Sequence, residues 1–284
     1  MKLILRILGS CGEETMQKPI KIVPLEDIDE KSFYNYLDKD RIRHIFTIYD
    51  LKNMREKTRV WVALRNSEIT GYLFEFERRF VHTHGDPESV SKLIGQTELD
   101  EPVLVVYPEH LTIVTEVFEP VEPLDSASKG KITTFLVMIV DAASFRPVIK
   151  HPVKKLGAND LDEIAKSLGE EYRERVQNAV DKGFAFGAYE NGYLASVATV
   201  PELLEDEALI RGVYTAQVLR SRGLATSACS ALVVEIIRYH RKPILWVSKD
   251  NLPALNVYKK LGFKETDIVL LCFKARRTRE PLKR

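Results

Sequence analysis

The 284-residue chain is poor in cysteine, and the few cysteines it has follow no pattern. Cys11, Cys229 and Cys272 are widely spaced and odd in number, and none belongs to a Cys-x-x-Cys pair. Such an arrangement provides neither a disulfide framework nor a cysteine-based zinc site, and it is typical of a protein kept in a reducing compartment. We therefore expect a cytoplasmic protein without structural disulfides.

The chain also lacks an excess of charge and a long apolar run. It has 42 lysines and arginines against 41 aspartates and glutamates, a net charge of +1. This balance argues against bulk attraction to nucleic acid or to an acidic membrane. No segment approaches the ~18 consecutive apolar residues of a membrane-spanning helix. The apolar start, from Met1 to Leu8, is interrupted by Arg6, so it does not match a secretory signal peptide. We expect no membrane partner, and a nucleic-acid partner is the least favoured of the possible partners.

What remains is the composition of an ordinary globular protein, with 45% hydrophobic and 29% charged residues. The length suits two domains at ~150 residues each. A break near His151 and Pro152 divides the chain into an N-terminal domain of residues 1–150 and a second domain of residues 151–284. His82, His84 and His110 fall on different expected elements of the first half. We therefore expect no metal site.

Hydrophobic patterning predicts an α+β protein with a mixed sheet flanked by helices. In the first half, the expected elements are a helix, Ser32 to Leu51, a short helix, Pro87 to Ile94, and the strands Arg59 to Ala63, Ile69 to Phe76, Pro102 to Tyr107, Thr112 to Phe118 and Thr133 to Val140. In the second half, two helices precede a strand hairpin around Asn191-Gly192, because Asn-Gly is a strong turn signal. The basic tail from Arg276 to Arg284 is expected to be disordered.

The most informative stretch is the loop Arg220-Ser221-Arg222-Gly223-Leu224-Ala225. It lies between a strand-like run, Ala208 to Thr215, and a helix-like run, Leu224 to Tyr239. A strand that opens directly onto a helix presents bare backbone N–H groups at the positive helix end, where phosphate binds readily. Gly223 lets a ligand approach the backbone without a Cβ in the way. The loop predicts a site for a phosphorylated cofactor, although alone it is weakly specific.

The segment that follows makes this interpretation specific. After the short apolar run Ile244 to Val247 comes Asn251-Leu-Pro-Ala-Leu-Asn-Val-Tyr258-Lys-Lys-Leu-Gly-Phe263. Together with the loop, this arrangement resembles the GNAT superfamily of N-acetyltransferases, whose [Arg/Gln]-x-x-Gly-x-[Gly/Ala] loop binds the pyrophosphate of acetyl-CoA. The resemblance covers roughly Val153 to Phe273. It implies the GNAT fold, with acetyl-CoA as co-substrate.

The resemblance also implies which residues bind the cofactor. The strand edge before the loop would pair with the pantetheine arm, the loop amides would surround the pyrophosphate, and the later helix would hold the arm near the thioester. The cofactor-binding residues expected on this basis are Val213, Tyr214, Thr215, Arg220, Ser221, Arg222, Gly223, Leu224, Ala225, Thr226, Asn251 and Tyr258. Asn251 would also cap its helix.

For catalysis, Tyr258 falls at the family's tyrosine position, where a phenol can protonate the departing thiolate. Its alternative role is packing beside Leu261 and Phe263. The family's strand glutamate corresponds to Leu209, which cannot act as a base. Glu207 is the best nearby candidate for the general base. It could equally be part of an acidic loop, with a water chain taking its place.

The first half looks like a second copy of the same fold. Val60 to Tyr72 reads much like Ala185 to Ala195, a strand, a turn and a strand. The corresponding phosphate loop would fall near His84 to Glu88, where the motif does not occur. We expect tandem GNAT-like domains whose N-terminal copy is degenerate; the alternative is an unrelated α+β domain.

These observations predict an N-acyltransferase that transfers acetyl from acetyl-CoA to a primary amine by direct attack. The acceptor would be a small molecule or a peptide, and the protein a monomer or homodimer. A CoA-binding regulatory or sensor module with lost catalysis is the alternative, because the strand glutamate is missing. A nucleic-acid-associated protein using the basic tail is a third option.

Overall fold

A computed structural model describes residues 19–278. The first half contains, in chain order, β1 (Lys21–Pro24), α1 (Glu30–Leu37), α2 (Ile45–Asn53), β2 (Thr58–Arg65), β3 (Glu68–Phe76), β4 (Phe80–Gly85), α3 (Pro87–Leu93), β5 (Val103–Val106), α4 (Leu111–Thr115), β6 (Phe118–Pro123) and β7 (Thr133–Ile139). The second half contains β8 (Val153–Lys155), α5 (Leu161–Leu168), α6 (Glu170–Asp181), β9 (Ala185–Glu190), β10 (Tyr193–Leu203), β11 (Glu207–Thr215), α7 (Leu224–Arg238), β12 (Lys242–Ser248), α8 (Leu252–Lys260) and β13 (Lys264–Arg277).

The two halves repeat one order of elements. Each runs strand, two helices, three strands, helix, strand and helix, and then ends in strand. The difference lies at the end, where the first half has two strands, β6 and β7, and the second has the single long strand β13. The expected mixed sheet with flanking helices and a tandem arrangement is confirmed.

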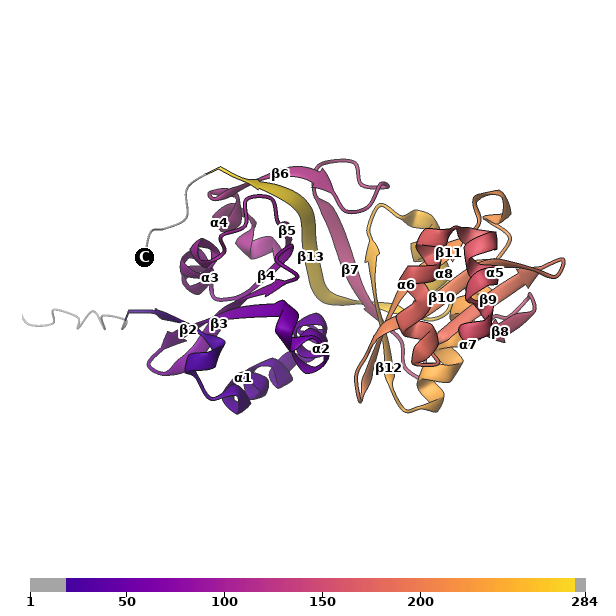
Figure 1. The fold of residues 1–284 in the computed structure, drawn as a ribbon, viewed down its shortest axis with the longest axis horizontal. Coiled ribbons are helices and arrows are strands. Elements are labelled where there is room, and N and C mark those ends of the chain that lie inside the picture. The colour runs from indigo at the N-terminus through magenta and orange to yellow at the C-terminus, as the bar shows by residue number, and fades with distance from the viewer. Residues whose placement is uncertain (1–18, 279–284) are drawn as a thin grey trace, which may run out of the picture.

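The two halves share one continuous sheet because they exchange their last strands. The strand order is β1-β2-β3-β4-β5-β13-β7-β12-β11-β10-β9-β8, and β6 pairs with the far end of β13. Thus β13 pairs with β5 of the first half, while β7 pairs with β12 of the second. Figure 1 shows β7 and β13 running side by side between the halves. The division at residue 150 stays a prediction. Two strands, β7 and β13, each pair with a strand from the other side of that division.

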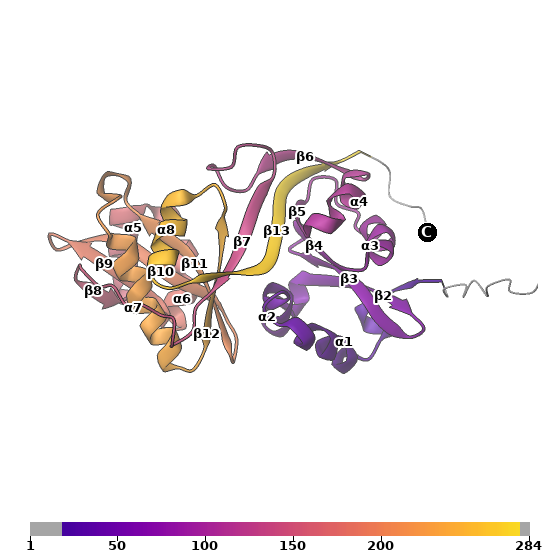
Figure 2. The same ribbon diagram turned by 180° about the vertical axis from the view of Figure 1, so that it is seen from behind.

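Helices cover both faces of each half. In the second half, α5 and α6 pack on one face of the sheet and α7 and α8 on the other, as the views in Figures 1 and 2 show from opposite sides. In the first half, α1 and α2 cover one face and α3 and α4 the other. One core also spans the halves, since residues of α1 and α2 pack with Leu209 and Ile244. No helix within residues 19–278 combines the length and apolarity needed to cross a bilayer.

Corresponding hairpins in the two halves use the same kind of turn. Between β2 and β3, Asn66 and Ser67 have φ values of 55° and 66°; between β9 and β10, Asn191 and Gly192 have φ values of 52° and 82°. Positive φ at both central positions matches the twist of a two-residue hairpin. The Asn-Gly turn is confirmed, and so is the resemblance between the two strand–turn–strand segments.

Two predicted elements of the first half are wrong in detail. Thr112 to Phe118 was expected to be a strand because of its β-branched residues, but it forms α4 and only the first residue of β6. Its Val114 is buried against α3 and β6, so packing overrides the weak local preference for a strand. The expected helix Ser32 to Leu51 is two helices. Asp40 accepts a hydrogen bond from the backbone N–H of Arg43 at 3.3 Å between them, and such local bonds compete with a helix.

The C-terminal prediction also needs correction. Arg276 and Arg277 were expected in a disordered tail, but both belong to β13. The guanidinium of Arg277 lies over the ring of Phe118 at 4.5 Å and donates to the carbonyl of Thr97 at 2.6 Å. The rest of the basic tail, the apolar N-terminal run and Cys11 lie outside the described residues.

Candidate functional site

The loop between β11 and α7 forms an open helix N-terminus. Gly223 is the N-cap residue of the 15-residue helix α7, with φ of 89°, and Ser221 also has a positive φ of 64°. A residue with a Cβ is strained in this region of backbone space, so glycine suits the N-cap position. Among the described residues, no side chain accepts a hydrogen bond from the first turn of α7. The amides of this turn can therefore bind an anion.

Neighbouring side chains fix the shape of the loop. The His151 Nε2–H donates to the carbonyl of Arg222 at 2.8 Å, and the guanidinium of Arg222 reaches Glu190 at 3.2 Å. The guanidinium of Arg220 lies 5.8 Å from the centre of the Tyr214 ring. Both arginines are exposed beside the helix end, so they add positive charge where an anion would bind.

The equivalent position in the first half is closed. Asp86 is the N-cap of the short helix α3, and its carboxylate accepts a hydrogen bond from the amide of Ser89 at 2.9 Å. The turn before it is also filled, because a Cβ on Gly85 would lie 2.5 Å from the Cα of Gly71. The chain's own carboxylate therefore occupies the place that the second half leaves free for an external anion.

The strands that carry the site separate just where the cofactor is expected. β11 and β12 pair in parallel only from Glu207 with Lys242 to Ile210 with Leu245. Beyond this point β11 has a bulge relative to β10, at Gly212 with φ of 64°. In the described structure, the β12 side of residues 213–215 has no strand partner. Val213, Tyr214 and Thr215 thus have no strand partner on this side within residues 19–278, and the carbonyl of Thr215 accepts a hydrogen bond from Arg220 at 3.3 Å.

The helix α8 follows β12 almost directly, with Asn251 as its N-cap residue and Tyr258 in its second half. Asn251 Oδ1 accepts a hydrogen bond from the amide of Ala254 at 3.3 Å, which confirms its predicted capping role. Tyr258 is buried among residues of α7 and β12, and its ring makes an edge contact with Phe263. Burial raises the pKa of the Tyr258 hydroxyl well above its ordinary value, so the group keeps its proton at neutral pH.

Cys229 lies in the same core, on α7. Burial raises the pKa of its thiol to about 12. A thiol that stays protonated is a poor nucleophile. Cys229 therefore packs in the core and is not suited to act as a nucleophile.

Glu207 lies at the start of β11 and makes a contact between the halves. The Arg41 guanidinium donates to both of its carboxylate oxygens, at 2.9 Å and 2.8 Å. This bidentate contact raises the pKa of Arg41. The pair fastens the segment between α1 and α2 to the beginning of β11. A catalytic role for Glu207 stays a prediction, and its carboxylate is already engaged.

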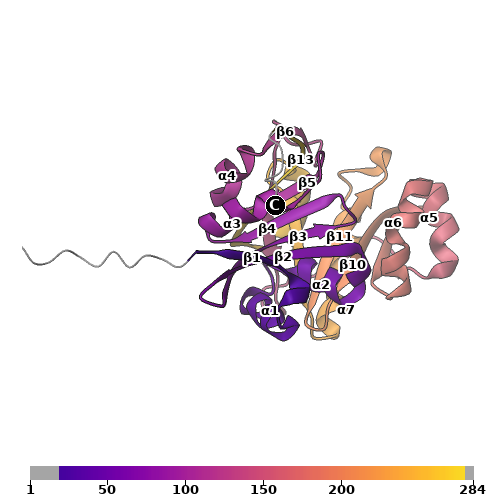
Figure 3. The same ribbon diagram turned by 60° about the vertical axis from the view of Figure 1, so that its left-hand side comes forward.

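A cavity of about 540 Å³ lies between the two halves and reaches the point where β11 and β12 separate. Arg211 and Trp246, the first residues beyond the last paired positions of these strands, line its second-half wall. Figure 3 shows α2 of the first half beside β10 and β11. Phe46 of α2 makes an edge contact with the Trp246 ring at 4.5 Å and stacks under the Arg211 guanidinium at 5.3 Å.

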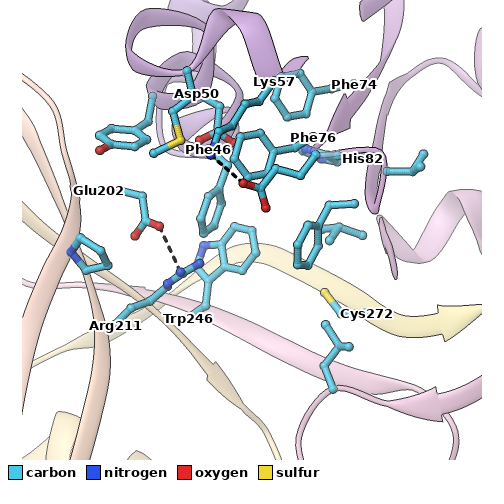
Figure 4. A pocket seen from close by; sticks show the side chains of 18 of the residues that line it. Phe46, Asp50, Lys57, Phe74, Phe76, His82, Glu202, Arg211, Trp246 and Cys272 are labelled. Carbon is cyan, nitrogen blue, oxygen red and sulfur yellow. Dashed lines mark hydrogen bonds and ion pairs between the residues drawn. The ribbon is translucent and has the colours of Figure 1, made fainter. Parts of the chain in front are cut away.

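Two carboxylates that sequence reasoning missed face this cavity, as Figure 4 shows. Glu202 on β10 forms an ion pair with Arg211 through Oε1 at 3.2 Å. Its Oε2 is buried and has no hydrogen-bond partner among the described residues. Asp50 on α2 is buried, and its carboxylate makes no hydrogen bond or ion pair within the described part of the chain. Burial, with the nearby charge of Glu202, raises the pKa of Asp50 to about 7. Burial also raises the pKa of Glu202.

Comparison with known proteins gives the following matches. Residues 186–270, from β9 into β13, match the family model described as FR47-like protein. A GNAT-family acetyltransferase from Colwellia psychrerythraea superposes with a TM-score of 0.55 at 12% identity, covering 91% of this chain and all of that one. A tandem GNAT protein from the clavulanic acid biosynthesis pathway gives 0.56 at 14% identity, covering 91% of this chain and 98% of its own. This chain has a tandem GNAT fold.

A Drosophila protein of known structure extends the likeness. It superposes on the tandem GNAT fold of this chain with a TM-score of 0.61 at 15% identity, covering 90% of this chain and 97% of that one. Comparison with curated protein sequences gives no match. At these identities the solved structures establish the fold, and the chemistry has to be argued from the residues of this chain.

The histidines of the first half lie closer together in this tandem GNAT fold than their sequence positions suggested. His84 packs on His44 with ring centres 4.4 Å apart, and its Nδ1 bonds the hydroxyl of Tyr36 at 2.8 Å. Burial lowers the pKa of His44 to about 2, of His82 to about 3 and of His84 to about 4. The cluster is therefore neutral. No group of three metal-ligating side chains occurs within residues 19–278.

Proposed function

We propose that the chain is an acyl-CoA-dependent N-acyltransferase that uses its second half to bind acetyl-CoA and acetylates a primary amine. One observation carries the proposal: an uncapped helix N-terminus, at Gly223, adjoins a pair of strands that separate beyond Ile210 and Leu245. The first feature suits a pyrophosphate and the second suits an extended pantetheine arm. The family match over residues 186–270 spans both features.

In this proposal the amides from Arg222 to Thr226 surround the pyrophosphate, with Arg220 and Arg222 adding charge. The backbone of Val213 to Thr215 pairs with the pantetheine amides, and Asn251 lies beside the same arm. The thioester then lies between the separated strands, near Arg211 and Trp246. Holding the donor there converts a bimolecular reaction into a positioned one.

The chemistry needs a neutral amine and a proton for the leaving sulfur. The amine nitrogen attacks the thioester carbonyl carbon, so a C–N bond forms and the C–S bond breaks. Tyr258 donates its hydroxyl proton to the departing thiolate and regains one from the nitrogen as the amide forms. Its raised pKa keeps this proton available at neutral pH. The proton lost when the ammonium becomes a neutral amine leaves through a carboxylate or water.

Two measurements test this function. Calorimetry should detect binding of CoA and acetyl-CoA to the full chain, and release of free thiol should be seen when acetyl-CoA is mixed with a suitable primary amine. A chain that binds neither ligand would refute the proposal. A chain that binds both but releases no thiol with any amine of a broad panel would instead be a CoA sensor, the alternative function.

A further inference from the structure

The cavity between the halves contains polar atoms that lack partners. Glu202 Oε2 and Trp246 Nε1 are buried and make no hydrogen bond among the described residues. Asp50, which is 8% exposed, is likewise unpaired there. A buried polar group without a partner is destabilising by about 1 to 3 kcal/mol. Two carboxylates and one N–H donor on residues that line the same space therefore indicate a ligand with complementary groups.

The cavity is lined by three cationic side chains, Lys57, Arg175 and Arg211, and by three carboxylates, so the pairing of these groups decides which charge a ligand meets. The Arg175 guanidinium lies over the Tyr172 ring at 5.4 Å. Of the positive groups facing Asp50, Lys57 pairs with Glu77 at 2.9 Å and Arg211 pairs with Glu202 through one oxygen only. Lys182 also acts on Glu202, but its ammonium is held by the Tyr49 hydroxyl and by the carbonyl of Pro201. The second oxygen of Glu202 and the whole Asp50 carboxylate are left without a positive partner within the described residues.

Much of the remaining wall is aromatic. Seven of the residues that line the cavity are phenylalanine, tyrosine or tryptophan, and they come from both halves: Tyr49, Phe80 and Phe135, together with Phe46, Phe74, Phe76 and Trp246, which Figure 4 labels. Such walls stabilise an apolar body or a flat ring, which can stack on or meet the wall rings edge-on. A volume of about 540 Å³ falls within the range of small-molecule sites, roughly 300 to 1,000 Å³.

We propose that this cavity, built jointly by the two halves, is the acceptor site, and that it binds a primary ammonium on an apolar, ring-sized body. Asp50 from the first half and Glu202 from the second hold the ammonium, and the phenylalanine and tryptophan rings hold the body. The proposal rests on the proposed function, since it places the acceptor beside the thioester. It gives the degenerate first half a purpose, because that half supplies Asp50 and most of the aromatic wall.

The same carboxylates explain how the amine loses its proton. When the ammonium is bound between them, one N–H proton moves to a carboxylate oxygen of Asp50, which leaves the nitrogen lone pair free to attack. That proton then leaves to solvent and restores the carboxylate, so no oxidant or further reactant is needed. Leu209, at the position of the family's strand glutamate, faces the shared core instead. Asp50 supplies the missing base from the other half of the chain.

Binding to this cavity can be measured without catalysis, because Trp246 lies in its wall. The chain has two tryptophans, so Trp61→Phe leaves Trp246 as the sole reporter of fluorescence. Three probes of similar shape test the charge preference: 2-phenylethylamine as cation, 2-phenylethanol as neutral analogue and 3-phenylpropanoate as anion. We expect the amine to bind at least about tenfold more tightly than the alcohol, and the anion most weakly. An anion or alcohol that binds as tightly as the amine would overturn the proposal.

Paired variants then test the two carboxylates. In the Trp61→Phe background, Asp50→Asn with Glu202→Gln should lower amine affinity at least about tenfold and leave alcohol affinity unchanged. Glu205→Gln with Asp206→Asn makes the same chemical changes at exposed positions a few residues away and should alter neither. Unchanged amine affinity in the first double variant would contradict the proposal.

The two proposals fail in different ways. Calorimetry with CoA on the same proteins reports the donor site alone, and the Asp50→Asn, Glu202→Gln variant should bind CoA like the parent. If CoA binds and the amine preference is absent, the acceptor assignment is wrong while the acyltransferase proposal stands. If CoA does not bind, the proposed function fails whatever the amine does.

Discussion

Replacing Asp50 with asparagine should stabilise the protein at alkaline pH and leave its stability at acidic pH nearly unchanged. The Asp50 pKa is about 7 in the folded chain, against an ordinary value of 3.8, because the carboxylate is buried and lies near Glu202. Below about pH 4 the group is protonated in both the folded and the unfolded chain, so it contributes no difference. As the pH rises from 4 to 7, the unfolded chain releases this proton and the folded chain retains it. The folded chain therefore loses stability over that range.

The size of the effect follows from the separation of the two pKa values. Each pH unit corresponds to about 1.36 kcal/mol, so a separation of about three units makes the ionised Asp50 destabilising by about 4 kcal/mol at pH 8. Asparagine stays neutral and avoids this penalty. For a chain of this size, roughly 2 °C per kcal/mol gives an increase in Tm of roughly 8 °C at pH 8.

Thermal unfolding followed by circular dichroism at pH 4.5 and pH 8 checks the prediction. The Tm of Asp50→Asn should exceed that of the parent by roughly 8 °C at pH 8 and by only roughly 2 °C at pH 4.5, where the penalty has fallen to about 1 kcal/mol. Asp206→Asn, an exposed aspartate, is the control and should follow the parent at both pH values. An Asp50→Asn protein that is less stable than the parent at pH 8 would refute the reasoning. In that case the Asp50 carboxylate would hold a favourable partner in the folded chain.

Three further predictions concern the second half of the chain. Gly223→Glu should lower CoA affinity at least about 100-fold in calorimetry, because it strains a backbone with φ of 89° and adds a negative charge at the helix end. The control Gly130→Glu, which lies in an open loop, should bind CoA like the parent. Tyr258→Phe should lower kcat by about 10²-fold with little change in CoA affinity. The control Tyr239→Phe, at an exposed helix end, should retain the parental kcat. Equal rates for the two variants would refute the acid role of Tyr258. Cys229 should resist iodoacetamide in the folded protein, because burial raises the pKa of its thiol to about 12. Mass spectrometry measures the labelling, and rapid labelling would contradict the buried position of Cys229.

The features of the proposed donor site could be predicted from the sequence because they are local. A strand, a turn with Gly223 and a helix follow one another within a few residues, and the Asn251 cap and Asn191-Gly192 turn are likewise set by neighbouring residues. The structure places each of these where local chemistry predicts it. The strand assigned to Thr112 to Phe118 failed for the opposite reason, since contacts with distant residues decide its conformation.

The cavity that we propose as the acceptor site could not be predicted, because it depends on the exchange of β7 and β13 between the halves. Asp50 and Glu202 are 152 positions apart in the sequence, and only the shared sheet brings them to the same space. One local signal was available. Asp50 is the single acidic residue in the helix α2, whose neighbours from Ile45 to Leu51 are almost all buried. An isolated acid in a buried helical segment indicates a functional or paired carboxylate.

The exchanged strands also bear on how the two halves work together. Since β13 completes the first half and β7 extends the second, neither half has its full sheet without the other. The Arg41 to Glu207 ion pair and the Phe46 to Trp246 contact lie across the same junction. The cavity walls are therefore fixed by the fold itself, which suits a site that must hold an acceptor amine at a set position from the thioester.

The most direct measurement of the central claim is a crystal structure of the chain with CoA bound. We expect the pyrophosphate within about 3 Å of the amides from Arg222 to Ala225, the pantetheine arm along Val213 to Thr215, and the sulfur between β11 and β12, facing the cavity that contains Asp50. CoA bound elsewhere, for example at the N-terminus of α3, or a donor site that stays empty at saturating CoA, would contradict it.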